Sequence, residues 1–163
     1  MTMGTYTQIM DELKRLGISH TMVDHPAAET TEEADRYIAG HEGVRTKSMF
    51  LKDKKKNFYL LIMDDKKRLD FHEFQDITGT KRISMARPND IQEQLGLAPG
   101  IISPFGLMNN EDHNVKVLFD KEMLDEPILT FHPNENTHTI FLKTDDVLHF
   151  VNEQGFEYEV IDL

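Results

Sequence analysis

The apolar segment at residues 97–106, LAPGIISPFG, limits the possible folds most strongly, because it cannot form a regular α-helix. Two prolines and two glycines interrupt it, and the same residues disfavour a central β-strand. Gly100 lets the backbone approach a ligand where a side chain would collide, and Pro104 fixes the backbone four residues later. The segment is therefore either a connection packed over the core or a loop that offers backbone N–H groups to a small polar ligand.

The length of 163 residues predicts one domain, 1–163, with enough chain to bury a hydrophobic core. No stretch approaches the about 18 apolar residues that a membrane span needs, and the first residues lack the pattern of a secretory signal. The absence of cysteine excludes disulfides, thiolate nucleophiles and cysteine-based zinc sites. We therefore expect a cytoplasmic protein without a membrane partner.

The formal net charge of −11 is unevenly distributed along the chain. Residues 45–87 hold 12 Lys and Arg against 6 Asp and Glu, a balance of +6, whereas the remainder has a balance of −17. The clusters at 54–56 and 66–68 are either solvated turns or part of a surface that docks a polyanion.

Apolar periodicity and capping residues predict many strands with short helices between and around them. We expect helices at 5–16, 30–39, 70–77, 88–95 and 144–152, and strands at 20–25, 46–51, 57–63, 82–86, 115–119, 128–131, 139–142 and 156–161. The polar turn at 53–56 joins two of these strands in a β-hairpin. Because strands and helices do not alternate regularly, the pattern favours an α+β domain with a mixed sheet.

Two polar residues in or beside these strands are candidates for chemistry. Lys47 precedes an apolar run, so its ammonium either lies on a polar face or faces a cleft, where it would hold a phosphate, a carboxylate or a developing oxyanion. His132 follows an apolar strand, so its ring is either satisfied by a neighbouring backbone group or forms a pocket wall that positions water.

Metal and cofactor motifs are absent from the sequence. The pairs His132/His138 and His20/His25 lack the spacing of a metal-binding helix, and no acidic residue completes a familiar pattern. No serine lies in a GxSxG motif, and neither GxGxxG nor a P-loop occurs. We expect neither a metal nor a cofactor.

Three motifs, taken in this order, resemble the YbaK/ProX family of aminoacyl-tRNA deacylases, which are related to the editing domain of bacterial prolyl-tRNA synthetase. They are TKSMFLKD at 46–53, PGIISPFG at 99–106 and FHP at 131–133. The resemblance covers nearly the whole chain and is nearest to the free-standing ProX/PrdX type, which removes alanine from proline tRNA. Ser48, Met49 and Ala98 differ from the residues commoner at these positions, and these departures concern amino-acid specificity rather than the reaction.

The resemblance implies a mostly antiparallel mixed sheet with flanking short helices, and hydrolysis of the ester between an amino acid and the terminal adenosine of tRNA(Pro). Alanine would enter a small pocket that excludes the larger proline. The implied catalytic residues are Lys47, Gly100 and His132, and the implied substrate-binding residues are Ile101, Ile102, Ser103, Pro104 and Thr130. No residue is assigned as a general base, and no cofactor is implied.

The implied partners are the acceptor end of mischarged tRNA(Pro) and prolyl-tRNA synthetase, and the oligomeric state is not predicted. Two alternatives stay open. One is a Cys-tRNA(Pro) deacylase of the same family, and the other is a non-catalytic module that senses an amino acid or a charged tRNA.

Overall fold

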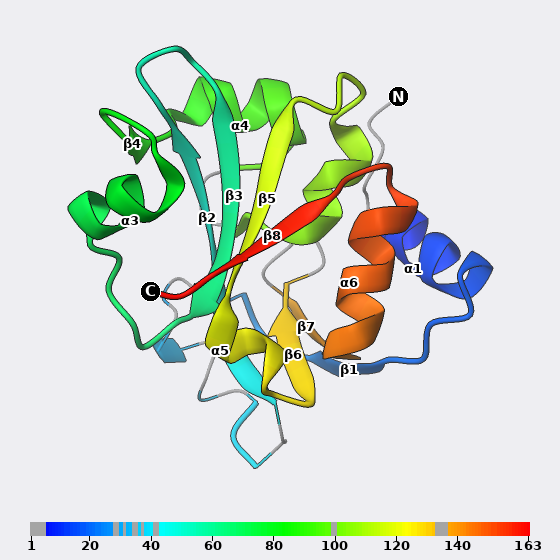
Figure 1. Cartoon of the computed structure of the whole chain (residues 1–163). Helices are drawn as coiled ribbons and strands as arrows, with labels where there is room; N and C mark the ends of the chain where they lie inside the picture. The colour runs from blue at the N-terminus through cyan, green and yellow to red at the C-terminus, as the bar shows by residue number, and fades with distance from the viewer. Residues whose placement is uncertain are drawn as a thin grey trace.

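The strands form one mixed sheet with β2 (Val44–Lys52) near its centre (Figure 1). The computed structural model describes residues 6–27, 30, 32–33, 36, 38–40, 43–98, 101–132 and 137–163. The strand order is β1-β7-β6-β2-β3-β5-β8, with β4 paired to β2. Four pairings are antiparallel and three are parallel. The predicted α+β class with a mixed sheet and short helices is confirmed.

The remaining elements include η2 and α5, which were not predicted, beside the predicted helices and strands. Their bounds are α1 Tyr6–Arg15, β1 Thr21–Asp24, β3 Phe58–Asp64, α3 Phe71–Thr78, β4 Ser84–Met85, α4 Pro88–Leu95, η2 Pro104–Asn109, β5 Val115–Asp120, α5 Lys121–Leu124, β6 Ile128–Phe131, β7 His138–Lys143, α6 Thr144–Glu153 and β8 Tyr158–Ile161. Among the described residues, no helix combines the length and hydrophobicity that crossing a bilayer requires.

β2 belongs to two groups of strands at once. Its first residues, Val44 and Arg45, lie parallel to Leu129 and Thr130 of β6. From Thr46 onward, β2 instead pairs antiparallel with β3, and the two form the predicted hairpin. β2 therefore joins the β1-β7-β6 group to the β3-β5-β8 group.

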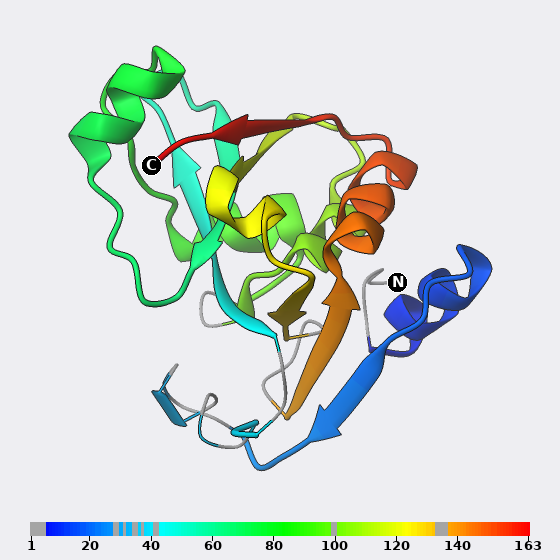
Figure 2. The ribbon, with the colours of Figure 1, turned by 60° about the horizontal axis from the view of Figure 1, so that its bottom comes forward.

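Side-chain alternation along β2 and β3 divides the core into two clusters. Phe50, Leu60 and Ile62 face the larger cluster, to which α1, α4, η2 and α6 contribute. Leu51 and Leu61 face the smaller cluster, which α3 covers. In Figure 2, α3 and α6 lie on opposite sides of the strands. Each residue of β2 therefore points toward one of two different environments.

Local capping signals place the helix starts well. Asp70 accepts hydrogen bonds from the backbone N–H groups of His72 and Glu73, at 2.9 and 3.1 Å, where α3 begins. The backbone N–H of Glu33 donates to the Thr30 hydroxyl at 3.1 Å, the contact expected of the predicted cap there. Much of the predicted helix at 30–39 lies outside the described residues.

The structure differs from the sequence-based expectations at two places, where one strand is shorter than predicted and one short 3-10 helix was not predicted. The strand expected at 82–86 contains only Ser84 and Met85, because only this pair reaches the end of β2. The segment after Ser103 forms the 3-10 helix η2, in which Pro104 takes an early position and the Ser103 hydroxyl accepts a hydrogen bond from the Phe105 N–H at 3.2 Å.

Candidate functional site

Lys47 lies on the face of β2 that α3 covers. It is paired with Met63 of β3, and alternation places it on the same face as Met49 and Leu51, which belong to the smaller core cluster. Its ammonium donates a hydrogen bond to the backbone carbonyl of Lys67, in the turn that follows β3. The side chain is therefore half-buried and directed at a turn rather than at open solvent.

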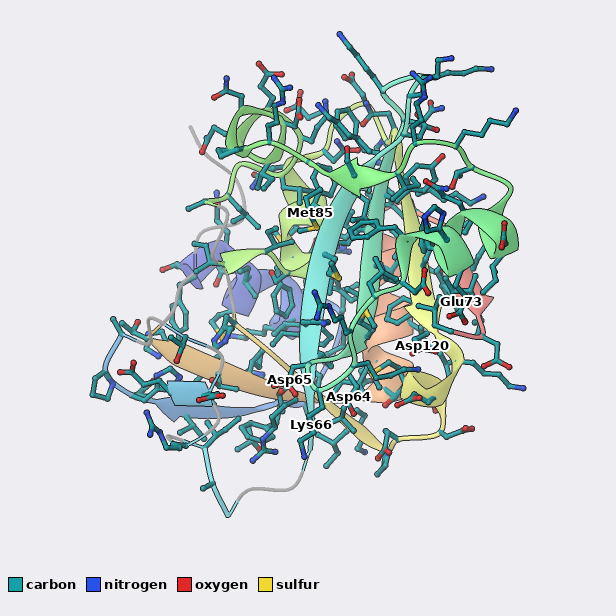
Figure 3. All side chains as sticks on the ribbon, turned by 90° about the vertical axis from the view of Figure 1, so that its left-hand side faces the viewer. Asp64, Asp65, Lys66, Glu73, Met85 and Asp120 are labelled. Atoms are coloured by element: carbon teal, nitrogen blue, oxygen red, sulfur yellow. The ribbon has the colours of Figure 1, made fainter. Side chains whose placement is uncertain are left out.

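Burial lowers the pKa of Lys47 from its ordinary value of 10.5, because the ammonium loses hydration. The negative charges of Asp65 and Asp64 oppose this effect, and the positive charge of Arg68 adds to it. Figure 3 shows Asp64, Asp65 and Lys66 together at one end of the β2–β3 hairpin. The charged turn at 64–68 therefore sets the electrostatic environment of Lys47.

Lys67 anchors this turn to the far edge of the sheet. Its ammonium lies 2.8 Å from a carboxylate oxygen of Asp120, 3.0 Å from one of Glu122 and 2.9 Å from the carbonyl of Leu163. The hydrogen bond to Asp120 raises the pKa of Lys67, against the effect of burial, and Glu122 adds to the rise. Asp120 is 1% exposed whereas the Lys67 side chain is 29% exposed, so the carboxylate of this ion pair is removed from water and the ammonium is not.

The segment at 101–106 packs on the opposite side of the sheet, against the larger core cluster. Ser103 and Pro104 are buried, whereas Ile101 and Ile102 are half-buried. The ring of Phe105 contacts Phe131 at the end of β6, edge to face, with centroids 6.3 Å apart. Pro99 and Gly100 lie outside the described residues, so the predicted ligand-approach role of Gly100 stays a prediction.

Gly106 shows a different need for glycine in this segment. A Cβ atom built there would lie 2.8 Å from Cδ1 of Leu97 and 3.1 Å from Cβ of Leu95. The close approach allows the start of η2 to pack directly on the end of α4. This packing role of Gly106 was not predicted from the sequence, where Gly100 was the glycine expected to be functional.

Thr130 connects β6 to β2 through two hydrogen bonds. Its buried hydroxyl donates to the carbonyl of Val44 at 3.0 Å, and its own carbonyl accepts from the Thr46 hydroxyl at 2.5 Å. These side-chain bonds reinforce the short parallel pairing of the two strands. Thr130 therefore lies beside β2. It contacts Thr46, the residue that precedes Lys47 in the sequence.

His132 is half-buried and lies within a group of histidines at the β1-β7-β6 end of the sheet. Its Nδ1 donates to the carbonyl of His138 at 3.1 Å, and its ring contacts that of His25, with centroids 6.2 Å apart. Nδ1 of His25 lies 2.9 Å from the Pro26 carbonyl, and its Nε2 lies 2.9 Å from the Thr139 hydroxyl. In the described part of the chain, no three His, Asp or Glu side chains form a candidate metal site.

The structure brings some predicted site residues together and separates others. Ser103, Pro104 and the end of β6 share the larger core, and His132 lies near His25. The Lys47 ammonium instead lies on the opposite face of β2. A narrow space with no room for a water molecule is lined by apolar side chains, among which Pro104 is a predicted site residue: Pro104, Phe105, Phe131, Leu142, Val147 and Phe150. This space lies within the core, and it is not a substrate pocket beside Lys47.

Comparison with known proteins identifies the family of this fold. A family model for the aminoacyl-tRNA editing domain matches residues 25–150, which include β2, η2 and β6. The chain belongs to the aminoacyl-tRNA editing domain family. The predicted family is confirmed, and so is the predicted enzyme class, an aminoacyl-tRNA deacylase.

Relatives of this editing domain match nine tenths or more of its length. The prolyl-tRNA editing protein ProX of Acetoanaerobium sticklandii is 30% identical over 164 residues, which is 100% of both chains. The prolyl-tRNA synthetase associated domain-containing protein 1 of Danio rerio is 28% identical over 90% of this chain and 80% of its own. The crystal structure of a proposed trans-editing enzyme for prolyl tRNA synthetase matches with a TM-score of 0.76 at 22% identity, over 100% of this chain and 98% of that one.

Proposed function

We propose that this editing domain acts in trans on mischarged tRNA(Pro) and hydrolyses the ester of Ala-tRNA(Pro). The observation that carries the proposal is the full-length similarity to the prolyl-tRNA editing protein ProX. In this proposal residues 1–163 form a single editing domain, and the partner is the acceptor end of the tRNA. Prolyl-tRNA synthetase, which creates the mischarged substrate, is the second proposed partner.

The proposed catalytic role of Lys47 rests on its electrostatic state. Its ammonium is partly desolvated, and the acceptor that it contacts, the Lys67 carbonyl, is neutral. A phosphate oxygen, or the oxyanion that forms when the ester carbonyl is attacked, carries negative charge and is a stronger acceptor than a neutral carbonyl. In the proposed mechanism, the ammonium leaves the Lys67 carbonyl and stabilises the oxyanion of the tetrahedral intermediate.

The proposed substrate contacts come from the other side of β2. Backbone N–H groups of the segment from Gly100 to Ser103 would hold the ester carbonyl and the attacking water. Ile101, Ile102 and Thr130 would bound the side-chain pocket, and His132 would close it with a polar tip. In this proposal the aminoacyl end of the tRNA lies beside the β2–β6 junction, where the Thr46 hydroxyl donates to the Thr130 carbonyl at 2.5 Å.

A small pocket explains why a separate editing protein is useful. A synthetase pocket built for proline gains only about 1–3 kcal/mol of discrimination against a smaller apolar substrate. A second pocket that is too small for proline rejects it by steric clash and accepts alanine. The same argument accommodates cysteine, so a Cys-tRNA(Pro) deacylase is the second candidate within the family.

Deacylation assays with tRNA(Pro) charged with alanine, cysteine, serine or proline test the proposal. We expect fast release of alanine, slow release of the other two small residues and no release of proline. Lys47→Ala and Lys47→Met should abolish release, because both remove the ammonium. The matched control is Lys116→Ala, which removes an exposed strand lysine that pairs with Glu159.

The outcome of these assays separates the enzyme from a sensing module. A wild-type protein that binds charged tRNA and releases none of the four amino acids supports a non-catalytic sensor. Preferential release of cysteine supports the second candidate. Release by Lys47→Met at the wild-type rate contradicts the catalytic role of Lys47.

A further inference from the structure

The basic segment at 45–87 does not form a single surface in the folded protein. β2 separates its two halves, because Lys47 lies toward the start of the strand and Lys52 at its end. At about 3.3 Å per residue, these two positions are about 17 Å apart. Figure 3 shows the separation, with Lys66 at one end of the hairpin and Met85 toward the other.

At the Lys47 end, Arg45, Lys47 and Lys67 are engaged within the protein, whereas Lys66 and Arg68 are exposed. Lys67 contacts Asp120 and Glu122, and the guanidinium of Arg45 donates to the carbonyls of Gly43 and Ile38. Asp64 and Asp65 add negative charge beside Lys47. This end of the segment is therefore close to electrical balance and offers little attraction to an external polyanion.

At the other end, the β2–β3 turn and the segment around β4 form one basic surface, which we call the hairpin-tip patch. The backbone N–H of Lys54 donates to the carbonyl of Lys81 at 3.3 Å, and Lys52 pairs with Ser84 across the two strands. Figure 1 shows the turn and β4 at the same end of the sheet. The exposed basic residues of the patch are Lys54, Lys55, Lys56, Lys81, Arg82 and Arg87.

The acidic residues in this region do not cancel the patch. Residues 52–57 and 79–90 contain seven basic and two acidic side chains, a balance of +5, although the chain as a whole has a net charge of −11. Asp90 pairs with Lys52 at 3.2 Å. Asp53 is turned inward, where it accepts hydrogen bonds from Tyr59 at 2.8 Å and from the backbone N–H of Lys55 at 2.8 Å.

The backbone of the patch is fixed in an unusual way for its residue types. Among the described residues, only three that are not glycine have positive φ, and two of them are Lys56 at 63° and Arg82 at 56°. Glycine adopts this left-handed conformation at no steric cost, whereas other L-residues pay roughly 1–2 kcal/mol. Basic side chains thus occupy two positions where the backbone favours glycine, which indicates that the charge itself is used.

We propose that the hairpin-tip patch binds the phosphate backbone of the double-stranded part of a tRNA, at a distance from the proposed catalytic end of β2. This inference rests on the proposed function, because it takes the aminoacylated end of the same tRNA to lie near Lys47. The single-stranded 3′ end of the tRNA then spans the distance of about 17 Å along β2. Contacts to phosphates supply affinity and position without reading sequence, so the patch itself does not select tRNA(Pro).

The test compares two substrates and two sets of variants. The substrates are Ala-tRNA(Pro) and an alanine ester of the single-stranded trinucleotide CCA, which has no duplex. The triple variant Lys54→Gln, Lys55→Gln, Lys56→Gln should raise KM for Ala-tRNA(Pro) by about tenfold. It should also reduce the slope of the logarithm of the binding constant against the logarithm of the salt concentration by about two to three. Its KM for the CCA ester and its kcat for both substrates should be unchanged.

Two controls keep the result specific. The triple variant Lys116→Gln, Lys121→Gln, Lys143→Gln removes the same charge from exposed positions elsewhere and should leave KM for Ala-tRNA(Pro) within about twofold. Lys56→Gly and Arg82→Gly relieve the backbone conformation, so they should weaken tRNA binding without lowering the melting temperature. A loss of binding in these variants therefore cannot be attributed to unfolding.

Each outcome separates the inference from the proposed function. A wild-type protein that releases alanine from neither substrate contradicts the proposed function. An active wild type whose KM for Ala-tRNA(Pro) is unchanged by the hairpin-tip variants overturns the assignment of the patch. So does an effect that appears only when prolyl-tRNA synthetase is present, because that result assigns the patch to a protein partner.

Discussion

The ammonium of Lys47 donates to the backbone carbonyl of Lys67, so the turn that carries one lysine fixes the side chain of the other. The side chain of Lys67 is in turn bound to Asp120 at 2.8 Å. The position of Lys47 therefore depends on a contact that crosses from β3 to the end of β5.

Replacing Lys67 should affect both stability and catalysis. Lys67→Met leaves the buried carboxylate of Asp120 without its cation, and we expect a loss of about 1–3 kcal/mol in the free energy of unfolding. Because the turn also loses its anchor, kcat for deacylation should fall by about tenfold, with a smaller change in KM. Urea unfolding and steady-state deacylation measure the two effects. Lys67→Arg, which keeps the charge, should recover most of the stability, and an unchanged kcat in Lys67→Met would contradict the positioning role.

The pKa of Lys47 should respond to its charged neighbours with a defined sign. Asp65→Asn removes a charge that opposes the effect of burial, so it should lower the pKa further, whereas Arg68→Gln should raise it. The lowered pKa means that the unfolded chain binds more protons than the folded one between the two pKa values, so this group makes stability rise with pH there. NMR titration of the Lys47 side chain gives this pKa directly. A titration at the ordinary value of 10.5 would refute the burial of this ammonium.

Tyr59 reports on the turn that forms the hairpin-tip patch. Burial, together with the hydrogen bond to Asp53, raises the pKa of Tyr59 to about 12 from its ordinary 10.0. The folded protein thus holds this proton through an interval in which the unfolded chain releases it, and stability falls as pH rises through that interval. Ultraviolet titration should show one of the four tyrosines ionising late, and Asp53→Asn should bring that pKa down. If no tyrosine ionises late, the turn is not closed by this hydrogen bond.

Gly106 and Gly79 should tolerate alanine to different degrees, for different reasons. A Cβ at Gly106 would lie 2.8 Å from Leu97 and 3.1 Å from Leu95, so Gly106→Ala should cost about 1–3 kcal/mol through overpacking. At Gly79 nothing lies within 4 Å of the Cβ, and the cost of about 1 kcal/mol comes from its positive φ alone. Thermal unfolding of the two variants measures this difference. Only Gly106→Ala should also reduce deacylation, because the 101–106 segment would have to move.

The elements that could be predicted from the sequence are those with local causes. The β2–β3 hairpin follows from two apolar runs around a polar turn, and the start of α3 follows from Asp70 as its cap. The prolines and glycines at 97–106 correctly excluded an α-helix, but they permit the tighter 3-10 turn that begins at Pro104. Helix α5 was missed because its four residues are too few to produce a periodic signal.

The arrangement of the site depends on contacts that no local pattern encodes. Alternation shows that Lys47 and Phe50 face opposite sides of β2, but it does not show which side α3 covers. The pairing of Arg45 with Thr130 joins residues 85 apart in sequence, and only the completed sheet reveals it. For the same reason, a basic segment that is continuous in sequence became two surfaces with different charge balance.

The parallel pairing of β2 with β6 consists of only two residue pairs, Val44 with Leu129 and Arg45 with Thr130, and we call this short junction the seam. The backbone hydrogen bonds of this pairing alone would oppose separation of the β1-β7-β6 group from the β2-β3-β5-β8 group only weakly. Side chains of the larger core cluster and the two threonine hydroxyls must supply most of the resistance to that separation. His132 is on one side of the seam and Lys47 on the other, so an aminoacyl group lodged between them would fasten the two halves together.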